Sequence, residues 1–239
     1  MNRQSRLPRL ILTRPRAQSE RFAANLPANF EICIAPLFEI AYIGRPDING
    51  VDAVILTSEN GARSQASLAG LIAFCVGPRT ADVASARGAI ARTMGGTAEK
   101  LVELLSAEKP DGHLVHLRGK HARGDVAARL TAAGLHCDEQ IVYEQVACPF
   151  PVDLATELAS GSPDTVPLFS PRSAQYFAAA CPSAPNATLM CLSEAVAAEL
   201  DETAYAAVEI CAAPNGKSME QALSRRAASL RLEGPPASS

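Results

Sequence analysis

The stretch "VILTSENGAR", residues 54–63, decides the fold because it passes from a buried strand directly into a helix. Its first three residues are apolar, and Thr57, Ser58, Glu59 and Asn60 are polar. The start of a helix leaves backbone N–H groups without partners inside the helix. A serine or threonine hydroxyl there can cap one of these donors, or the donors can bind an anion. For this single site both interpretations stay open.

The same pattern recurs along the chain, where short apolar runs alternate with longer alanine-rich amphipathic segments. We expect strands at Leu10–Thr13, Glu31–Leu37, Ala53–Thr57, Ile72–Val76, Leu114–Leu117, Gln140–Val146, Val166–Phe169, Thr188–Leu192 and Val208–Cys211. We expect helices at Arg16–Asn25, Asn60–Ala69, Thr80–Arg87, Thr97–Glu108, Asp125–Ala133, Val152–Ala159, Ser173–Ala180, Glu194–Leu200 and Ser218–Ser229. Parallel strands require crossover connections, so this order predicts an α/β fold with parallel sheets covered on both faces.

An internal repeat suggests that the chain contains two similar α/β units. "ILTSENGAR" resembles "PLFSPRSAQ", which places Ser58 opposite Ser170, and "CVGPRTADVA" resembles "CLSEAVAAEL". "LTRP" and "LRGK" place Arg14 opposite Arg118, and "PLFEI" and "IVYEQ" place Phe38 opposite Tyr143. Two such units predict a cleft between them. Helix starts follow the expected strands after Thr57, Val76, Gly96, Phe169, Leu192 and Gly216, so this cleft could surround a ligand with many carboxylates or phosphates.

The composition limits the classes of partner. A formal net charge of −3 over 239 residues argues against a generally basic surface for nucleic acid. The start, "MNRQSRLPRL", lacks the apolar run of a secretion signal, and the apolar stretch 68–76 is too short to span a bilayer. The seven cysteines are odd in number and form no CxxC pair, which is typical of reduced thiols. We therefore expect a cytoplasmic protein that binds neither nucleic acid nor membrane.

No motif indicates a nucleotide or a metal. The chain contains no GxGxxG and no GxxxxGK[ST] sequence. "RGKHARGD", residues 118–125, is either a cationic rim or a solvated loop, with a binding role favoured for Arg118 because it lies at a strand end. His113 and His116 are three residues apart on a strand and so face opposite sides of the sheet. With His121, we interpret them as ordinary histidines rather than metal ligands.

In this order, the motifs "LTRP", "ILTSENGAR", "FCVGPRTADVA", "GGTAEKLVELL", "LRG" and "IVYEQ" resemble the uroporphyrinogen-III synthase family over residues 10–223. The resemblance implies an enzyme without a cofactor, a lyase of haem biosynthesis. Its substrate is hydroxymethylbilane, a linear tetrapyrrole with an acetate and a propionate on each ring. The enzyme of this family closes the linear tetrapyrrole with ring D inverted, through a spiro pyrrolenine intermediate, and gives uroporphyrinogen III and water. We also expect a monomer that receives its substrate by transient hand-over from hydroxymethylbilane synthase.

The resemblance further implies a discontinuous architecture of two flavodoxin-like parallel-sheet domains joined by a two-stranded linker, with the active site in the cleft between them. Domain one would be residues 1–37 with 148–239, and domain two residues 38–147. "APLFEI" and "IVYEQVAC" would be the two crossing strands. The tail "LEGPPASS" is expected to be disordered.

The family pattern also nominates residues. Tyr143, in "IVYEQ", matches the family's tyrosine implicated in activity, and its phenol could donate a hydrogen bond to the departing hydroxyl. A linker tyrosine that merely packs is the other interpretation. The expected substrate-binding residues are those at strand ends and helix starts: Arg14, Thr57, Ser58, Asn60, Gly77, Thr80, Gly96, Arg118, Ser170, Ser173, Ser193 and Ser218. Ser193 and Val196 depart from the family's Gly and Thr, so a threonine contact is absent there.

Two alternatives come from other classes of protein. A two-lobed sensor that closes around a small anion without chemistry would share the fold and the cleft. The isomer formed from hydroxymethylbilane distinguishes it from the synthase. A phosphosugar or nucleotide transferase is disfavoured by the missing phosphate loop and the missing cluster of metal-binding aspartates.

Overall fold

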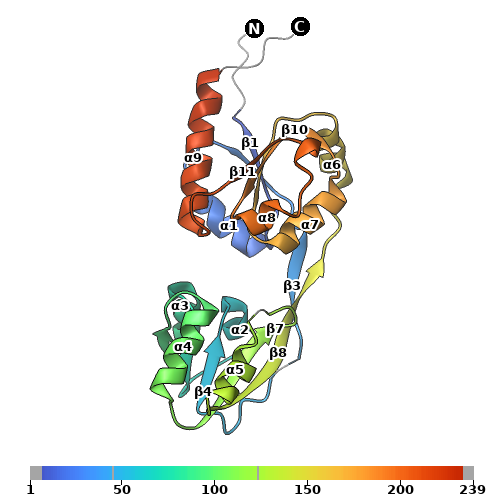
Figure 1. Ribbon diagram of the computed structural model, residues 1–239. Helices are drawn as coiled ribbons and strands as arrows, with labels where there is room; N and C mark the ends of the chain where they lie inside the picture. Colours follow the sequence, from blue (N-terminus) through green and yellow to red (C-terminus); the bar gives the residue numbers. More distant parts are fainter. Residues whose placement is uncertain (1–6, 45, 123, 234–239) are drawn as a thin grey trace. The chain divides into compact units, whose positions relative to one another are not determined.

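The computed structural model describes residues 7–44, 46–122 and 124–233, and the chain divides into two compact units (Figure 1). The split unit comprises the residues up to Glu39 and those from Ala147 onward, and the inserted unit is Ile40–Val146. The chain passes from one unit to the other in strand β3 (Phe38–Tyr42) and returns in strand β8 (His136–Ala147).

The split unit contains a five-stranded sheet in the order β11-β10-β9-β1-β2, in which every described strand pair is parallel. Numbered in chain order within the unit, this is the flavodoxin-like order 2-1-3-4-5. Its elements are β1 (Arg9–Leu12), α1 (Arg16–Ala24), β2 (Glu31–Ile34), α6 (Val152–Ala159), β9 (Thr165–Leu168), α7 (Pro171–Ala180), β10 (Ala184–Cys191), α8 (Glu194–Ala197), the 3₁₀-helix η1 (Glu202–Ala204), β11 (Tyr205–Ile210) and α9 (Gly216–Glu233).

The inserted unit contains a six-stranded sheet in the order β3-β8-β7-β4-β5-β6. Strands β8, β7, β4, β5 and β6 are parallel neighbours. β3 lies at the edge beside β8, where the amide of Ile43 donates to the carbonyl of Val142 at 3.0 Å. The other elements are β4 (Ala53–Leu56), α2 (Glu59–Arg63), β5 (Ile72–Cys75), α3 (Pro78–Ala86), β6 (Ile90–Thr93), α4 (Ala98–Glu108), β7 (His113–Gly119) and α5 (Val126–Ala132).

The internal repeat of the sequence is present in the topology. The repeat motifs pair β1 with β7, β4 with β9 and β5 with β10, and the positions in the two sheets then pair β2 with β8 and β6 with β11. With these pairs, the order β11-β10-β9-β1-β2 in one sheet matches the order β6-β5-β4-β7-β8 in the other. The units differ in where the chain enters: β1 and β2 open the split unit, whereas β7 and β8 close the inserted unit.

Helices cover both faces of each sheet, as the alternating pattern predicts (Figure 1). In the split unit, α6, α7 and α8 pack on one face, and α1 and α9 pack on the other. In the inserted unit, α4 and α5 pack on one face, and α2 and α3 on the other. The central strands are therefore buried on both sides: Val54, Ile55 and Leu56 are each 0% exposed. Burial of such a continuous apolar run fixes the strand and positions the polar residues that follow it.

Several expected elements have different bounds in the structure. The expected strand Glu31–Leu37 ends at Ile34, and β3 follows it, although the amides of Ala35 and Leu37 still donate to the carbonyls of Leu12 and Thr13, each at 3.0 Å. The expected helix Asn60–Ala69 ends at Arg63. The carbonyl of Gln65 instead accepts from the Arg87 guanidinium, at 2.6 Å, and the amide of Leu68 donates to the carbonyl of Arg87, at 2.7 Å.

The edge strand β6 has no counterpart among the expected strands. Its first residue, Ile90, is 65% exposed, so the strand has little apolar signal. β8 begins at His136 rather than at the expected Gln140. In the tail, residues 232 and 233 end α9, and residues 234–239 lie outside the described residues. Each helix in the described part of the chain is too short or too polar to cross a membrane.

Candidate active site

Each sheet has one place where the chain leaves two neighbouring strands in opposite directions. In the split unit this place lies between β1 and β9, because β1 continues to β2 on one side and β9 continues to β10 on the other. In the inserted unit it lies between β4 and β7. Doubly wound sheets bind ligands outside the carboxyl ends of the strands at such switch points. These two switch points are the candidate sites.

The switch point of the inserted unit gathers several of the residues nominated by the sequence. Thr57 and Ser58 follow β4 directly, and Arg118 is the penultimate residue of β7. Ser58 caps α2, since its Oγ accepts from the amide of Asn60 at 3.2 Å. The cap uses one donor of the helix start, where the first turn has four.

Tyr143 belongs to the same cluster, although it lies on β8. Burial raises the pKa of its phenol, and a hydrogen bond with the Ser58 side chain opposes that rise. Its ring lies against Gly119, where an added Cβ would be 2.7 Å from Cζ of the ring. Only glycine permits this approach. Gly119 is therefore part of the candidate site. It lies in the motif "LRG", but it is not among the residues nominated from the sequence.

Phe38, the repeat counterpart of Tyr143, has a different environment. It is 5% exposed and packs in the core of the split unit, with its ring centroid 6.1 Å from that of Tyr176. Tyr143 carries its hydroxyl beside Gly119, the last residue of β7, whereas Phe38 packs inside an apolar core. The two counterparts therefore differ in their surroundings as well as in the hydroxyl.

The guanidinium of Arg118 is held by its own unit. Its Nη2 donates to Glu139, and its Nη1 donates to the carbonyl of Gly119 at 3.0 Å. The hydrogen bond from Arg118 lowers the pKa of Glu139. Lys120 in the same run pairs with Glu144 at 2.9 Å, and Arg123 lies outside the described residues. To bind a ligand carboxylate directly, Arg118 would have to give up its hydrogen bond to Glu139.

The switch point of the split unit is built in the same way. The Arg14 guanidinium carbon lies 4.5 Å from the ring centroid of Phe169, the residue before Ser170. Ser170 and Ser173 form a reciprocal capping box, with Oγ of each accepting from the amide of the other at 3.1 and 3.0 Å. These hydroxyls have a structural role at the start of α7.

The remaining nominated residues follow the carboxyl ends of the outer strands. Gly77 is the N-cap of α3, and Thr80 is 7% exposed within it. Gly96 has a φ of +90°, and the residue after it, Thr97, caps α4. Ser193 precedes α8 without a side-chain capping bond. Ser218 lies in the first turn of α9, where its amide donates to Oδ1 of Asn215 at 2.9 Å.

The histidines divide between the two faces of the sheet, as their spacing predicts. Nε2 of His113 lies 2.9 Å from Oδ2 of Asp138, and its ring stacks on that of His136 with an interplanar angle of 13°. Donor atoms of these three residues lie within 4.8 Å of one another. The ring nitrogens of stacked imidazoles have their lone pairs in two nearly parallel, separate planes, which is unfavourable for both rings to ligate one ion. The arrangement is a His–Asp pair with a stacked neighbour, at the amino ends of β7 and β8.

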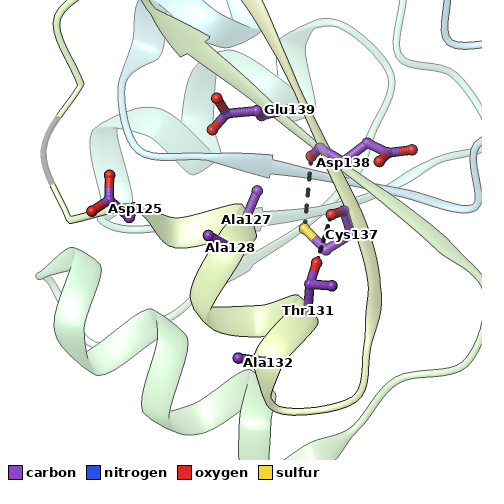
Figure 2. A pocket seen from close by; sticks show the side chains of 8 residues that line it. All are labelled: Asp125, Ala127, Ala128, Thr131, Ala132, Cys137, Asp138 and Glu139. Atoms are coloured by element: carbon purple, nitrogen blue, oxygen red, sulfur yellow. Dashed lines mark hydrogen bonds between the residues drawn. The ribbon is translucent and has the colours of Figure 1, made fainter.

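A hollow beside α5 is unsuited to an anionic ligand. Figure 2 shows the carboxylates of Asp125 and Glu139 beside it, together with alanines of α5, whereas the carboxylate of Asp138 points away from α5. The Thr131 hydroxyl donates to the carbonyl of Cys137 at 2.9 Å. Carboxylates repel a polyanion, so the candidate site stays at the switch points.

The fold and its polar strand ends define a class: a two-unit, doubly wound α/β protein with polar residues at matching switch points. The family model described as uroporphyrinogen-III synthase HemD matches residues 26–221. The chain therefore belongs to the uroporphyrinogen-III synthase family, whose members are cyclising lyases of haem biosynthesis.

Solved structures show the same fold. A uroporphyrinogen-III synthetase from Helicobacter pylori is 18% identical, with a TM-score of 0.67 over 92% of this chain and 100% of that chain. A mutant uroporphyrinogen III synthase from the extremely thermophilic bacterium Thermus thermophilus is 16% identical, with a TM-score of 0.53 over 93% of this chain and 99% of that chain. The comparison with curated protein sequences finds no match.

Proposed function

We propose that this chain converts hydroxymethylbilane to uroporphyrinogen III and water, and that the residues at its two switch points carry the reaction. The observation that carries the residue assignment is the cluster of Tyr143, Ser58 and Gly119 at the β4/β7 switch point. The phenol of Tyr143 lies beside the carboxyl end of β7, and ligands of doubly wound sheets bind at the carboxyl ends of the strands.

The substrate suits main-chain recognition. Each of its four rings carries an acetate and a propionate, so it is a polyanion, while the chain itself has a formal net charge of −3. Backbone amides at helix starts attract carboxylates without requiring a basic surface. Helix α7 in the split unit and helices α3 and α4 in the inserted unit begin at the carboxyl ends of strands. We assign carboxylate binding to these starts and to the loops after β1 and β4.

The reaction requires selection as well as acceleration. Loss of hydroxide from the substrate gives an azafulvene, which can close head to tail without rearrangement. The inverted product arises when the substituted α-carbon of ring D attacks the methylene carbon of the azafulvene. The resulting spiro pyrrolenine fragments and closes in the opposite sense. Holding the chain in the conformation for spiro attack is a positioning effect.

Tyr143 is assigned to the departure of hydroxide. Burial raises the pKa of its phenol, so the hydroxyl keeps its proton near neutral pH and can donate a hydrogen bond to the leaving oxygen. The pyrrole nitrogens supply the electrons that expel hydroxide, and the oxygen leaves as water after protonation. Tyr143 assists this step and leaves the closing bonds to the substrate.

We further propose that the enzyme acts as a cytoplasmic monomer with functional domains 1–37 plus 148–239 and 38–147. Because its substrate closes spontaneously, hand-over from hydroxymethylbilane synthase would shorten the time available for the unrearranged reaction. Family membership favours this synthase over an anion sensor without catalysis.

The isomer assay tests the proposal. The purified chain is incubated with hydroxymethylbilane, and the oxidised products are separated into type I and type III uroporphyrins. We expect type III to dominate. A product ratio equal to that in buffer alone would refute the proposed function.

A further inference from the structure

His116 is a buried histidine to which the proposed reaction assigns no role. It lies within β7 with 1% of its surface exposed, between Ile55 of β4 and Glu139 of β8 in the parallel register. Its Nε2 lies 3.1 Å from Oγ1 of Thr57. Its Nδ1 is buried and has no hydrogen-bond partner among the described residues. One ring nitrogen is thus committed to Thr57, and the other is not.

The imidazole is neutral at physiological pH. Burial lowers its pKa to about 4; the charge of Glu139 opposes this shift and that of Arg118 adds to it. A neutral imidazole has one N–H and one lone pair, so the two nitrogens must take different roles.

The unpaired Nδ1 indicates which nitrogen carries the proton. If Nδ1 carried it, a buried N–H would have no acceptor, which is rare in folded proteins. If Nε2 carries it, Nε2–H donates to Thr57 Oγ1, and only a lone pair is left unpaired. The second arrangement satisfies the donor and is favoured.

This tautomer fixes the role of the threonine. When Oγ1 of Thr57 accepts from His116, its own proton must point to another acceptor. No other hydrogen bond engages this hydroxyl within the described residues. Thr57 is half-buried and follows β4 at the switch point, two residues beyond the register pair Ile55 and His116.

We propose that His116 is a positioning residue, whose Nε2–H holds Thr57 Oγ1 and so presents the threonine hydroxyl proton to a carboxylate of the substrate. The inference rests on the proposed function for the identity of that carboxylate. It makes the Thr57 hydroxyl a hydrogen-bond donor for an anion, whereas the Ser170 hydroxyl donates to Oγ of Ser173 at 3.2 Å and the Ser58 side chain is hydrogen-bonded with Tyr143.

The tautomer can be measured without substrate. Long-range ¹H–¹⁵N correlation spectra of the ¹⁵N-labelled full chain distinguish Nε2–H from Nδ1–H by the shifts of the two nitrogens. We expect His116 to be a neutral Nε2–H imidazole at neutral pH. An Nδ1–H tautomer or an imidazolium would overturn the proposal, whatever the isomer assay shows.

Substitutions then test the consequence for substrate binding. Thr57→Val should raise KM for hydroxymethylbilane about tenfold, the loss of a hydrogen bond to a charged group, with little change in kcat. His116→Leu should raise KM similarly. His116→Gln, whose amide can still donate to Thr57, should restore much of the affinity. In the Thr57→Val background, His116→Leu should add nothing further.

The matched control is His136→Gln, a histidine substitution at the amino edge of the same sheet, which should leave both constants unchanged. Circular dichroism shows whether each variant is folded. If His116→Leu does not fold, the tautomer and the His116→Gln variant decide. Two results would show that His116 only packs. One is that His116→Leu raises KM equally in the wild type and in the Thr57→Val background. The other is that a folded His116→Gln variant has a KM as high as that of Thr57→Val.

Discussion

Acid titration gives a quantitative test of the buried state of His116. The folded pKa is about 4, compared with an ordinary value of 6.5, so the unfolded chain takes up a proton at a higher pH than the folded chain. Between these values the unfolded state binds more protons, and the free energy of unfolding falls as the pH falls. At about pH 4.5 the two pKa values correspond to a loss of about 2.5 kcal/mol, and at about pH 7.5 to almost none.

The variant His116→Gln lacks this titration. Urea unfolding of both proteins, followed by circular dichroism at about pH 7.5 and about pH 4.5, should therefore show the wild type losing about 2.5 kcal/mol more than the variant. Glu139 and Arg118, the charged groups that face His116, are present in both proteins. The His136→Gln control should follow the wild type. Equal losses in wild type and His116→Gln would refute the claim that this imidazole is held neutral by burial.

Three further substitutions test the site and the fold. Tyr143→Phe should lower kcat at least severalfold while the far-ultraviolet spectrum stays unchanged, and unaltered kinetics would remove the phenol from the mechanism. Gly119→Ala places a Cβ 2.7 Å from the Tyr143 ring, so it should displace the phenol and lower kcat in a folded protein; full activity would contradict that contact. Gly61→Ala places a Cβ 2.5 Å from the carbonyl oxygen of Leu117 and should cost about 2 kcal/mol of stability in urea unfolding. Gly216→Ala, with nothing within 4 Å of the added Cβ, is its control, and equal stability of the two variants would contradict the crowding at Gly61.

The sequence predicts the sheets well where burial is continuous. The apolar run before Thr57 and its repeat before Ser170 mark central strands, and the matching strand orders of the two sheets agree with the repeat. β6 could not be predicted in this way, because an edge strand with Ile90 exposed buries too little to leave an apolar pattern.

The site is less accessible from sequence, because its contacts join distant positions. The strand-end rule finds Thr57, Ser58 and Arg118, since each follows or ends an apolar run. Their partners do not follow from local pattern: Gly119 meets Tyr143 only because β7 and β8 are neighbours, and His116 meets Thr57 only through the register of β4 and β7. The period of two along β7 does separate His113 from His116, and the structure confirms that they have different partners.

The central claim is that main-chain donors at the two switch points bind the carboxylates of the tetrapyrrole. Backbone amide spectra of the full chain, recorded anaerobically with and without uroporphyrinogen III, test it most directly. We predict the largest shifts in residues 57–60 and 170–173, which follow β4 and β9. Shifts confined to the amino ends of the strands, such as those around His136, would contradict the account.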